Sequence, residues 1–378
     1  MREVLLLLSG LFAWRTKSLV GLDIGTSRVK MVELAAKRGS VELVRAAVEL
    51  TPVDAIRDGK VVRPDLVAGT IRKAMAAGRF RPGEVVAAIA GQGVVVRHAK
   101  FPRMPEDELK QAMKWEAQKY IPFPVEKAVM DYSVMRRDSE DQSMDVMIVA
   151  SPNDLIESHL QAIELAGLTP TAIDVQPFTV LRALKYQPQG SQEPPCVVDG
   201  TVAYIYIGAG TTDIVIARDD DLRFTRIVPV GGATFTRAIA ERLGISFEEA
   251  ERVKIERGRV CADGIDSLDG DDRAMAQAIM EVVQAMVEDV RRSIDYHDLQ
   301  LNAPGDGLEV KQVILAGGGS VLDGLDRYVG DELGLPTKMC NPLRNVAVSP
   351  RVASRIDIKK MGPMLAVGIG LALREVVD

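Results

Sequence analysis

The chain has few of the residues that build disulfide-rich domains, transition-metal sites and base-stacking surfaces. Three cysteines and three histidines are scattered through 378 residues, so neither a disulfide framework nor a zinc site is expected. Aromatic residues make up 4% of the chain, which leaves little for stacking against bases. Acidic residues outnumber basic ones, the formal net charge is −6, and no basic patch is visible in the sequence. We therefore expect no nucleic-acid partner, because such partners require dense positive charge.

Long apolar runs are also missing, except at the start of the chain. Residues 1–14 read MREVLLLLSGLFAW, and Arg15 and Lys17 follow them. This run is shorter than the roughly 20 apolar residues that span a bilayer, and Ala13-Trp14-Arg15 is not a clean signal-peptidase site. Two interpretations stay open: a helix that touches a membrane or a partner, and a short terminal helix that is packed or frayed. The scattered cysteines fit a reducing cytoplasm.

Strand-like runs occur in two similar sets separated by glycine turns. The first set covers residues 20–24, 29–35 and 41–50, and the second covers residues 202–207, 214–217 and 223–228. This repeated order indicates an internal duplication of one supersecondary unit. A stretch rich in Gln, Pro and Gly at residues 186–195 indicates a surface loop at a domain junction.

Helical periodicity and further strand-like runs lie between and after these sets. The expected helices cover residues 65–77, 106–120, 154–166, 235–243, 246–257, 273–298 and 362–374, and the further strands cover residues 85–89, 94–99 and 313–315. Gly78 stands where a glycine C-cap is expected, and Ser246 begins a capping box with Glu249. Runs at residues 130–135 and 144–150 flank a polar loop and predict a hairpin in the first half.

Three glycine-rich turns are the motifs that indicate a ligand. Their residues are Gly25, Thr26 and Ser27; Gly208, Ala209, Gly210, Thr211 and Thr212; and Gly317, Gly318, Gly319 and Ser320. Glycine lets the backbone approach a phosphate closely, and successive N–H groups form an anion-binding nest. One such turn alone is typical of an ordinary β-turn. Three in order across duplicated halves favour a nucleotide whose phosphates are clamped from both sides.

These motifs resemble those of the actin-like ATPase superfamily. Asp23-Ile24-Gly25-Thr26-Ser27 resembles its first phosphate motif, the turn at 207–213 its second, Ala250-Glu251-Arg252-Val253-Lys254 its ribose motif and Gly317-Gly318-Gly319-Ser320 its adenosine motif. A more specific resemblance runs through Phe101-Pro102-Arg103-Met104-Pro105, Trp115-Glu116, Tyr120-Ile121-Pro122-Phe123-Pro124 and Asp131-Tyr132. That segment resembles the PilM family of type IV pilus assembly proteins, relatives of the cell-division protein FtsA.

The resemblance implies an α/β, actin-like ATPase fold with two related domains and an α/β subdomain inserted in the first. It implies a first domain at residues 18–199, with the insert at about 84–169, and a second domain at residues 200–346. Residues 347–378 are expected to return to the first domain, and residues 1–17 form an apolar and basic N-terminal segment.

The resemblance also assigns roles to single residues, each beside a plainer alternative. Asp23 would hold Mg²⁺ through water, or be a turn residue that accepts backbone N–H bonds. Lys30 would reach the phosphates, or be an exposed strand lysine. Gln176 would orient the attacking water, or be a hydrogen-bonded residue before a proline. Thr211 and Thr212 would donate hydroxyls to phosphate, or be ordinary strand threonines.

The ribose motif follows the same pattern. Glu251 and Lys254 are three residues apart on the expected helix, so they share one face. The resemblance places this pair on the ribose and adds Gly232 to the nucleotide contacts. Without the resemblance, the pair is typical of a surface ion pair.

One position departs from the superfamily pattern. The second phosphate motif begins with an aspartate where this chain has Tyr206. A phenol with a pKa of about 10 does not replace a carboxylate beside Mg²⁺ at neutral pH. Asp213 is a candidate substitute, but it is expected on the following strand and receives little weight. We therefore predict nucleotide binding with slow or absent hydrolysis, which leaves enzymatic activity an open question.

The resemblance implies a cytoplasmic scaffold at the inner face of the inner membrane, in the platform that assembles type IV pili for twitching motility. Its expected ligands are ATP or ADP with Mg²⁺. Its expected partner is the cytoplasmic N-terminal peptide of PilN, lying between the first subdomain and the insert, with other platform proteins and membrane association through the partner. A small-molecule kinase, which requires a carboxylate base, and a chaperone-like ATPase, which requires a separate substrate domain, are the alternatives.

Overall fold

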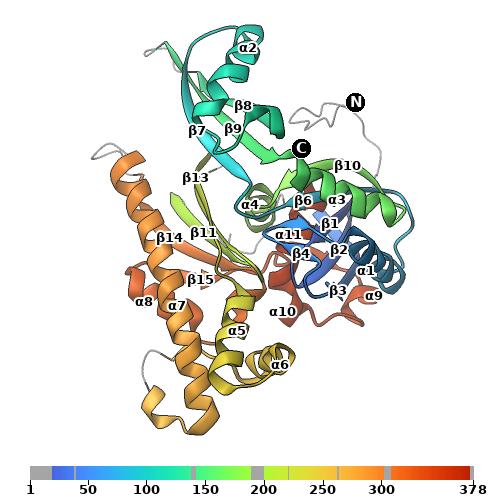
Figure 1. The fold of residues 1–378 in the computed structure, drawn as a ribbon, viewed down its shortest axis with the longest axis vertical. Helices are drawn as coiled ribbons and strands as arrows, with labels where there is room; N and C mark the ends of the chain where they lie inside the picture. The colour runs from blue at the N-terminus through green and yellow to red at the C-terminus, as the bar shows by residue number, and fades with distance from the viewer. Residues whose placement is uncertain are drawn as a thin grey trace.

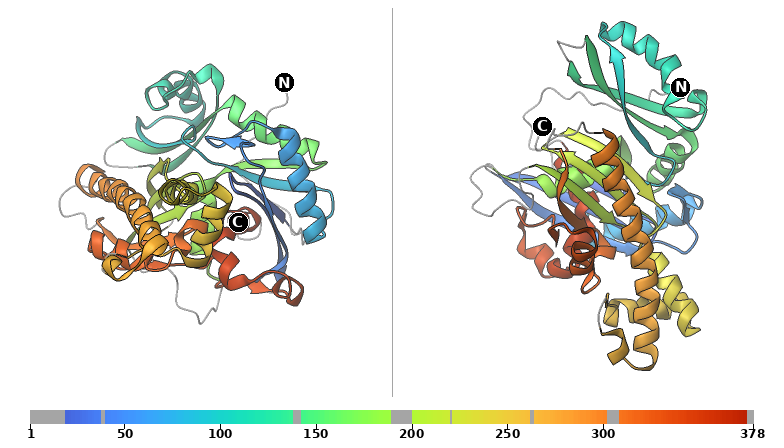
Figure 2. Two further views of the ribbon diagram at one scale, coloured as in Figure 1. Left: turned by 60° about the horizontal axis from the view of Figure 1, so that its bottom comes forward. Right: turned by 90° about the vertical axis from the view of Figure 1, so that its left-hand side faces the viewer.

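The structure is a computed structural model. It describes residues 19–37, 40–137, 142–188, 200–219, 221–261, 264–301 and 308–374. Two large sheets lie side by side with helices around them, and a small sheet with its own helix stands at one end of the molecule (Figure 1). The right-hand view of Figure 2 shows the small sheet and α2 above the rest.

The first large sheet has six strands in the order β10-β6-β1-β2-β3-β16. Its strands are β1 (Leu19–Ile24), β2 (Arg28–Lys37), β3 (Ser40–Leu50), β6 (Glu84–Ile89), β10 (Thr169–Val175) and β16 (Ala347–Val348). The opening meander predicted from the sequence is confirmed, because β1, β2 and β3 pair antiparallel in turn. The strands β6 and β10 add to it in parallel, as strands joined by long crossovers do.

The second large sheet repeats this topology. Its order is β13-β12-β11-β14-β15, formed by β11 (Thr201–Ile207), β12 (Thr212–Arg218), β13 (Asp221–Val228), β14 (Val310–Ala316) and β15 (Thr337–Met339). Here too an antiparallel meander is followed by two parallel strands. The order β3-β2-β1-β6-β10 in the first sheet therefore matches β13-β12-β11-β14-β15 in the second. This match confirms the duplication inferred from the strand patterns.

The small sheet has three strands in the order β7-β9-β8: β7 (Val95–Pro102), β8 (Ala128–Arg137) and β9 (Ser143–Pro152). The predicted hairpin is confirmed as β8 and β9. Helix α2 (Glu106–Glu116) covers this sheet and buries Leu109 and Met113 against Phe101 and Met144. The short helices η1 (Ala117–Lys119) and η2 (Val125–Lys127) follow α2. The small sheet thus lies within a narrower range than 84–169, because β6 and β10 belong to the six-stranded sheet.

The helices of the first half pack on both faces of the first sheet. They are α1 (Pro64–Gly78), α3 (Asn153–Leu165), α4 (Gln176–Lys185) and α11 (Ala366–Leu373), with a small hairpin of β4 (Ile56–Arg57) and β5 (Lys60–Val61) beside them. All eight residues of α11 are buried, as expected for a helix that is apolar on every side. It lies against β1 and α4, and its glycines permit this: a Cβ on Gly370 would stand 1.8 Å from the Thr179 carbonyl oxygen.

The end of α1 differs from the expectation. Gly78 is the last helical residue, and Arg79 adopts the left-handed conformation of the cap, with φ of 57°. A Cβ on Gly78 would stand 2.2 Å from the Phe80 ring, so the glycine is needed for close packing there. The left-handed conformation costs a residue with a side chain about 1–2 kcal/mol.

The helices of the second half are α5 (Gly232–Leu243), α6 (Phe247–Arg257), α7 (Gly270–Tyr296) and α8 (Leu325–Leu333). The short elements are α9 (Pro350–Ala353), α10 (Ile358–Met361), η3 (Ile265–Ser267), η4 (His297–Leu301), η5 (Gly318–Val321) and η6 (Gly362–Leu365). The expected capping box at α6 is half formed. The Ser246 hydroxyl accepts the Glu249 N–H at 3.1 Å, but the Glu249 carboxylate binds Arg252 instead.

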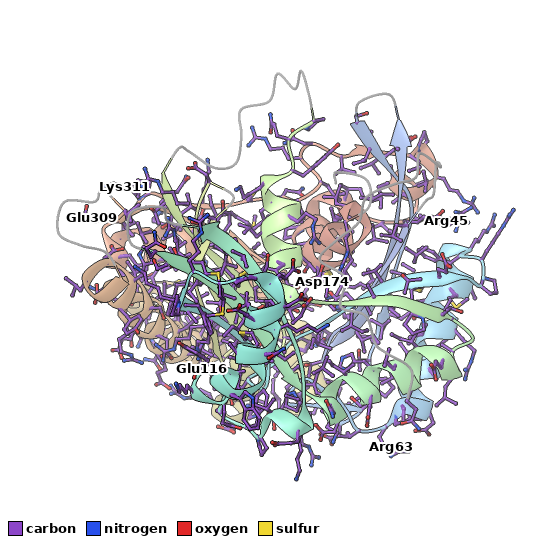
Figure 3. All side chains as sticks on the ribbon, turned by 90° about the horizontal axis from the view of Figure 1, so that it is seen from above. Arg45, Arg63, Glu116, Asp174, Glu309 and Lys311 are labelled. Atoms are coloured by element: carbon purple, nitrogen blue, oxygen red, sulfur yellow. The ribbon has the colours of Figure 1, made fainter. Side chains whose placement is uncertain are left out.

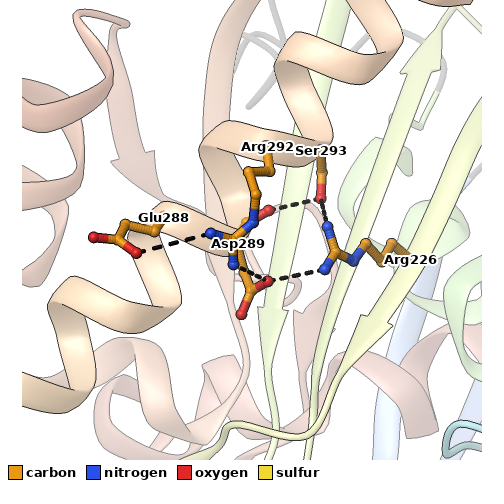
Figure 4. Close-up of polar contacts among 5 residues, drawn as sticks. All are labelled: Arg226, Glu288, Asp289, Arg292 and Ser293. Atoms are coloured by element: carbon orange, nitrogen blue, oxygen red, sulfur yellow. Dashed lines mark hydrogen bonds and ion pairs between the residues drawn. The ribbon is translucent and has the colours of Figure 1, made fainter.

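Polar contacts tie the long helix α7 to strand β13 (Figure 4). Arg226 of β13 donates to the Asp289 carboxylate at 2.9 Å and to the Ser293 hydroxyl at 3.4 Å. Arg292 holds the same Asp289 oxygen at 2.8 Å. On its inner face α7 buries Val283, Met286 and Val290, among other residues, so the helix forms one wall of the second core.

Two cysteines lie in the part of the chain that the structure describes. Cys261 is free, whereas Cys340 is buried and disulfide-bonded. The wide spacing of the cysteines does not predict that bond, because only the fold brings distant residues together. No helix of the described residues is long and apolar enough to cross a bilayer. The apolar run at residues 1–14 lies outside the described residues.

Candidate functional site

The first glycine turn joins β1 to β2 and carries a buried ion pair. Asp23 and Lys30 face each other across the two strands, and the Lys30 ammonium lies 2.5 Å from the Asp23 carboxylate. Both residues are less than one-tenth exposed, so Lys30 is not an exposed strand lysine. A Cβ on Gly25 would stand 2.9 Å from the Arg28 carbonyl oxygen and 3.5 Å from Lys30 Nζ. The turn therefore passes directly over the pair.

The second glycine turn joins β11 to β12 and rests on the start of α5. The Gly208 N–H donates to the Thr211 carbonyl at 2.9 Å, and the Gly232 N–H donates to the Gly208 carbonyl at 2.8 Å. A Cβ on Gly231 would stand 2.6 Å from the Ala209 carbonyl oxygen, so only glycine allows the helix this close. The Thr212 hydroxyl is buried and donates to the Val230 carbonyl at 2.7 Å, which ties the turn to the segment between β13 and α5.

The two turns touch each other. A Cβ on Gly210 would stand 3.1 Å from the Thr26 hydroxyl oxygen. The fold thus brings together residues that are far apart in the sequence, one from each large sheet. The two turns therefore face each other, as a clamp on both sides of a phosphate chain requires.

The third glycine turn follows β14 and lies against the second. Gly317 has a φ of 91°, and a Cβ there would stand 2.4 Å from the Ile207 carbonyl oxygen. A Cβ on Gly319 would stand 2.3 Å from the Ile207 side chain, and the nearest atom to one on Gly318 belongs to Met364. The Ser320 hydroxyl closes the turn by donating to the Gly317 carbonyl at 2.7 Å.

The helices α5 and α6 meet in a small polar network. The Lys254 ammonium donates to the Gly232 carbonyl at 2.8 Å, to the Thr236 hydroxyl at 2.6 Å and to the Glu251 carboxylate at 2.6 Å. The Thr236 hydroxyl in turn donates to Glu251. Desolvation lowers the pKa of Lys254, and Glu251 opposes that change. Because the Lys254 side chain is 11% exposed, the pair is not an ordinary surface ion pair.

Gln176 links the two halves. It is the first residue of α4, and its side-chain amide donates to the Asp213 carboxylate of β12 at 2.6 Å. The corner before α4 is fixed by Asp174, which lies near the middle of the molecule in Figure 3 and binds Arg182 at 3.2 Å and Arg374 at 3.4 Å. Gln176 is therefore held by a partner residue rather than being only a residue before a proline.

Asp213 is a member of the site that the sequence did not emphasise. It is fully buried, and its Oδ1 atom has no hydrogen-bond partner among the described residues. Burial raises the pKa of Asp213 to about 7, against the opposing effect of the hydrogen bond from Gln176. The antiparallel register places Asp213 directly across from Tyr206. Counting residue pairs outward from the glycine turn in the sequence would place Asp213 opposite Tyr206.

Tyr206 is also buried, and its pKa is raised well above the ordinary value. Desolvation is the main cause, and the charges of Asp23 and Asp213 add to it. The phenol therefore stays protonated and lies within electrostatic reach of the carboxyl groups of both halves. Thr236 and Arg28 were also missed in the sequence. The charge of Arg28 acts on Lys254 across the space between the halves.

The polar atoms of this site suit a magnesium ion bound together with a nucleotide better than a metal ion bound by protein side chains alone. Among the described residues no three Asp, Glu, His or Cys side chains gather as a metal site. Mg²⁺ bound with nucleotides keeps several waters and takes one or two carboxylates with the phosphates. Asp23, together with the buried and unpartnered oxygen of Asp213, satisfies that requirement.

Comparisons with solved structures give the fold its family. The chain superposes on the "PilM-PilN type IV pilus biogenesis complex" with a TM-score of 0.81 and 32% identity, covering 96% of this chain and 99% of that one. MreB5 of Spiroplasma citri bound to ADP matches with a TM-score of 0.51 and 13% identity, covering 96% and 97% of the two chains. The actin-like ATPase fold expected from the motifs is thereby confirmed.

Sequence comparisons agree. Cell division protein FtsA of Streptococcus pneumoniae serotype 2 is 20% identical over 382 residues, which cover 91% of this chain and 80% of FtsA. The family model described as "Type IV pilus assembly protein PilM" matches residues 21–376. Because that match spans nearly the whole chain, the protein belongs to the PilM family of type IV pilus assembly proteins.

Proposed function

We propose that the protein is a nucleotide-binding scaffold of the type IV pilus assembly platform. The observation that carries the nucleotide part is the contact between the two phosphate turns, with Thr26 against Gly210. The third turn and the Lys254 network adjoin the second turn, so one ligand can reach all of them. The proposed nucleotide contacts are Asp23, Gly25, Thr26, Ser27, Lys30, Gly208, Ala209, Gly210, Thr211, Thr212, Gly232, Glu251, Lys254, Gly317, Gly318, Gly319 and Ser320.

The contacts divide by chemistry. The N–H groups of Gly208 and Gly232 are bonded to carbonyls within the fold, so N–H groups at the tips of the turns, such as those of Thr26 and Gly210, bind phosphate oxygens together with the Lys30 ammonium. Glu251 and Lys254 bind the ribose hydroxyls. Thr212 contributes through its backbone, since its hydroxyl is bonded to Val230. Asp23 holds Mg²⁺ through water, and Mg²⁺ supplies the positive charge that neutralises the phosphates. ATP and ADP both satisfy these contacts.

The same geometry supports slow or absent hydrolysis. The Gln176 amide, which would orient the attacking water, is bonded to Asp213 at 2.6 Å. Tyr206 supplies no negative charge at neutral pH, because its pKa is raised. Releasing Gln176 leaves the buried Asp213 carboxyl with no partner, which is costly. ATP therefore acts as a structural ligand that joins the halves.

The partner proposal rests on the relative of known structure. That relative is a PilM–PilN complex with 32% identity over nearly the whole chain. We propose as a ligand the cytoplasmic N-terminal peptide of a PilN-type membrane protein, bound between the first sheet and the small sheet. This places the chain in the cytoplasm at the inner face of the inner membrane, with other platform proteins as further contacts.

Thermal unfolding with and without Mg-ATP tests the nucleotide proposal. A ligand at 100 times its Kd stabilises the folded state by about 2.7 kcal/mol, so the midpoint rises by several degrees. Lys254→Met removes the ribose contact and should lose this shift. Arg252→Met is the matched control on the same helix, because Arg252 is exposed and bonded to Glu249. An unchanged midpoint in the wild type refutes nucleotide binding.

A second set of measurements distinguishes the scaffold from a kinase or a chaperone-like ATPase. Adding a PilN N-terminal peptide should raise the midpoint further, and purified protein should release phosphate from ATP slowly or not at all. Turnover at about 1–100 per second, the range of active kinases, would refute the scaffold and favour the kinase or chaperone-like ATPase.

A further inference from the structure

Arg28 is a cation of the candidate site whose side chain has no partner. It begins β2, directly after the first glycine turn, and its carbonyl accepts the Gly25 N–H at 3.1 Å. Its guanidinium makes no hydrogen bond or ion pair with another residue in the part of the chain that the structure describes. Lys30 and Lys254, by contrast, are each paired with a carboxylate. The five N–H donors of the Arg28 guanidinium are therefore available to a ligand.

The alternation of β2 places Arg28 on the face of the sheet that carries the Asp23–Lys30 pair. Successive side chains of a strand point to opposite faces, so residues two apart share a face. Arg28 shares a face with Lys30, whereas Val29 between them is fully buried in the hydrophobic core. The residue paired with Arg28 on β3 is Leu50, which is 66% exposed. This end of the face is therefore open, and Arg28 is half-buried there.

The second half approaches this end of the face. Thr26, two residues before Arg28, lies against Gly210 of the second turn. A Cβ on Gly232, which donates to the second turn, would stand 3.7 Å from Lys254 Nζ. Desolvation lowers the pKa of Lys254, and the charge of Arg28 lowers it further. Two cations, one from each half, thus face the same space.

The position of Arg28 indicates which part of a nucleotide it would meet. In the proposed function Lys30 binds phosphate oxygens and Lys254 binds the ribose. Arg28 is two residues from Lys30 on one face and acts electrostatically on Lys254, so it lies between the phosphate end and the ribose end of the ligand. An anion at this point is attracted by both halves, whereas without an anion Arg28 and Lys254 repel each other.

We propose that the Arg28 guanidinium binds the nucleotide phosphate next to the ribose, which ATP and ADP have in common. The planar guanidinium matches phosphate oxygens in a bidentate manner. This inference rests on the proposed nucleotide binding and adds to it a side-chain contact that the phosphate motifs do not assign. The charge that repels Lys254 without nucleotide then attracts the ligand that joins the halves.

Equilibrium binding of Mg-ADP and Mg-ATP to the full chain tests the proposal. Arg28→Met should bind both nucleotides about 10–100 times more weakly than the wild type, by the same factor for each. Arg28→Lys keeps the charge without the planar fork, so it should lose less affinity. Arg351→Met is the matched control, because it removes an exposed arginine from α9, which begins beside Leu43 at the other end of β3. The control should bind as the wild type does.

Thermal midpoints without nucleotide distinguish a ligand contact from a structural role. Arg28→Met removes no side-chain bond within the described fold and relieves the repulsion of Lys254, so its midpoint should equal or exceed that of the wild type. The rise of the midpoint with Mg-ADP should be smaller than in the wild type. A lower midpoint without nucleotide, an equal loss of affinity in Arg351→Met, or a loss confined to Mg-ATP overturns the proposal.

The two proposals fail in different ways. If the wild type binds Mg-ATP and Arg28→Met binds it equally well, the role of Arg28 is refuted and the proposed function stands. If the wild type binds neither nucleotide, both are refuted.

Discussion

Asp213 is a buried carboxyl group at the contact between the two halves. Its Oδ2 atom accepts from Gln176, and its Oδ1 atom has no partner in the part of the chain that the structure describes. In an unfolded chain an aspartate has a pKa of about 3.9, whereas burial raises the pKa of Asp213 in the fold to about 7. The folded state therefore holds the proton more tightly than the unfolded state.

The sign of the pH dependence follows from this difference. The stabilising contribution of the bound proton is complete below about pH 4 and is lost as the pH rises to about 7. Asp213→Asn cannot lose a proton, so relative to the wild type it should gain up to about 4 kcal/mol between these limits. Urea unfolding at a series of pH values measures this gain. Asp295→Asn, an exposed site, is the control, and parallel curves for Asp213→Asn and the wild type would contradict the expectation.

The Asp23–Lys30 pair leads to a second prediction at this scale. Lys30→Met leaves Asp23 buried without its partner, which should cost about 3–5 kcal/mol of unfolding free energy. Adding Asp23→Asn removes the unpaired charge and should recover much of that loss. The exposed pair of Lys60 and Asp154, at 2.6 Å, provides the comparison: Lys60→Met should cost less than about 1 kcal/mol. Equal costs at the two sites, measured by urea unfolding, would contradict the importance of burial.

The sequence predicts some of these residues and misses others for one physical reason. Asp23, Lys30 and Lys254 lie in motifs that are continuous along the chain. Thr236 and Arg28 reach the site through helix packing and strand register, which a local pattern does not contain. Asp213 receives little weight from the sequence, because its position opposite Tyr206 follows only from strand pairing across the hairpin.

At the scale of elements, α11 shows how small residues set a packing distance. Gly370 faces the Thr179 carbonyl of α4, and a Cβ on Gly21 of β1 would stand 2.3 Å from the Gly368 carbonyl. The helix is thus held between α4 and β1 at a separation that no larger side chain permits. The sequence predicts an apolar helix with several glycines here, and the close packing against α4 and β1 explains why those positions are glycine.

Two glycine substitutions test this packing. Gly370→Ala places a Cβ 1.8 Å from a backbone oxygen, so it should destabilise the protein by about 1–3 kcal/mol or more. Gly69→Ala in α1 meets nothing within 4 Å and should stabilise by about 0.5–1 kcal/mol. Both free energies come from urea unfolding. If Gly370→Ala were as stable as Gly69→Ala, α11 would not be packed against α4.

Element positions were largely predictable, whereas element ends and sheet membership were not. Apolar alternation located the strands of both meanders, because each strand has one buried face. The sequence predicts a strand near β6, none at β10 and an insert at about 84–169, yet β6 and β10 pair with each other in the six-stranded sheet. Parallel pairing between strands so distant in sequence leaves no local signal. We propose that the strands of the six-stranded sheet belong to the first domain and those of the five-stranded sheet to the second.

At the scale of the whole molecule, two sheets of the same topology carry the site between them and a small sheet stands apart. On one face of the small sheet the side chains form clusters of their own with α2, whereas Val96 and Val149 on the other face belong to the core of the first half. Hydrogen exchange should therefore show protection by Mg-ATP at the three glycine turns, with little change in β7, β8 and β9. Protection of equal size in the small sheet would contradict a ligand that bridges only the halves.

Four arginines of the first half, Arg45, Arg79, Arg351 and Arg355, show what composition hides, because the charges of the other three act on Arg351. A net charge of −6 describes the average of the chain, and no basic run appears in its sequence. The strands β3 and β16 bring residues near 45 and 350 together, so the local charge arises from tertiary structure. Surface charge of this kind can be read only after the pairing of the strands is known.

The contact between Thr26 and Gly210 also has a kinetic consequence. Because the two phosphate turns touch, the proposed nucleotide site must open before a triphosphate enters, so opening precedes binding. The observed association rate should then rise with nucleotide concentration only to a plateau, which equals the rate of opening. Gly210→Val, whose side chain would press on Thr26, should hold the turns apart and raise that plateau in stopped-flow measurements.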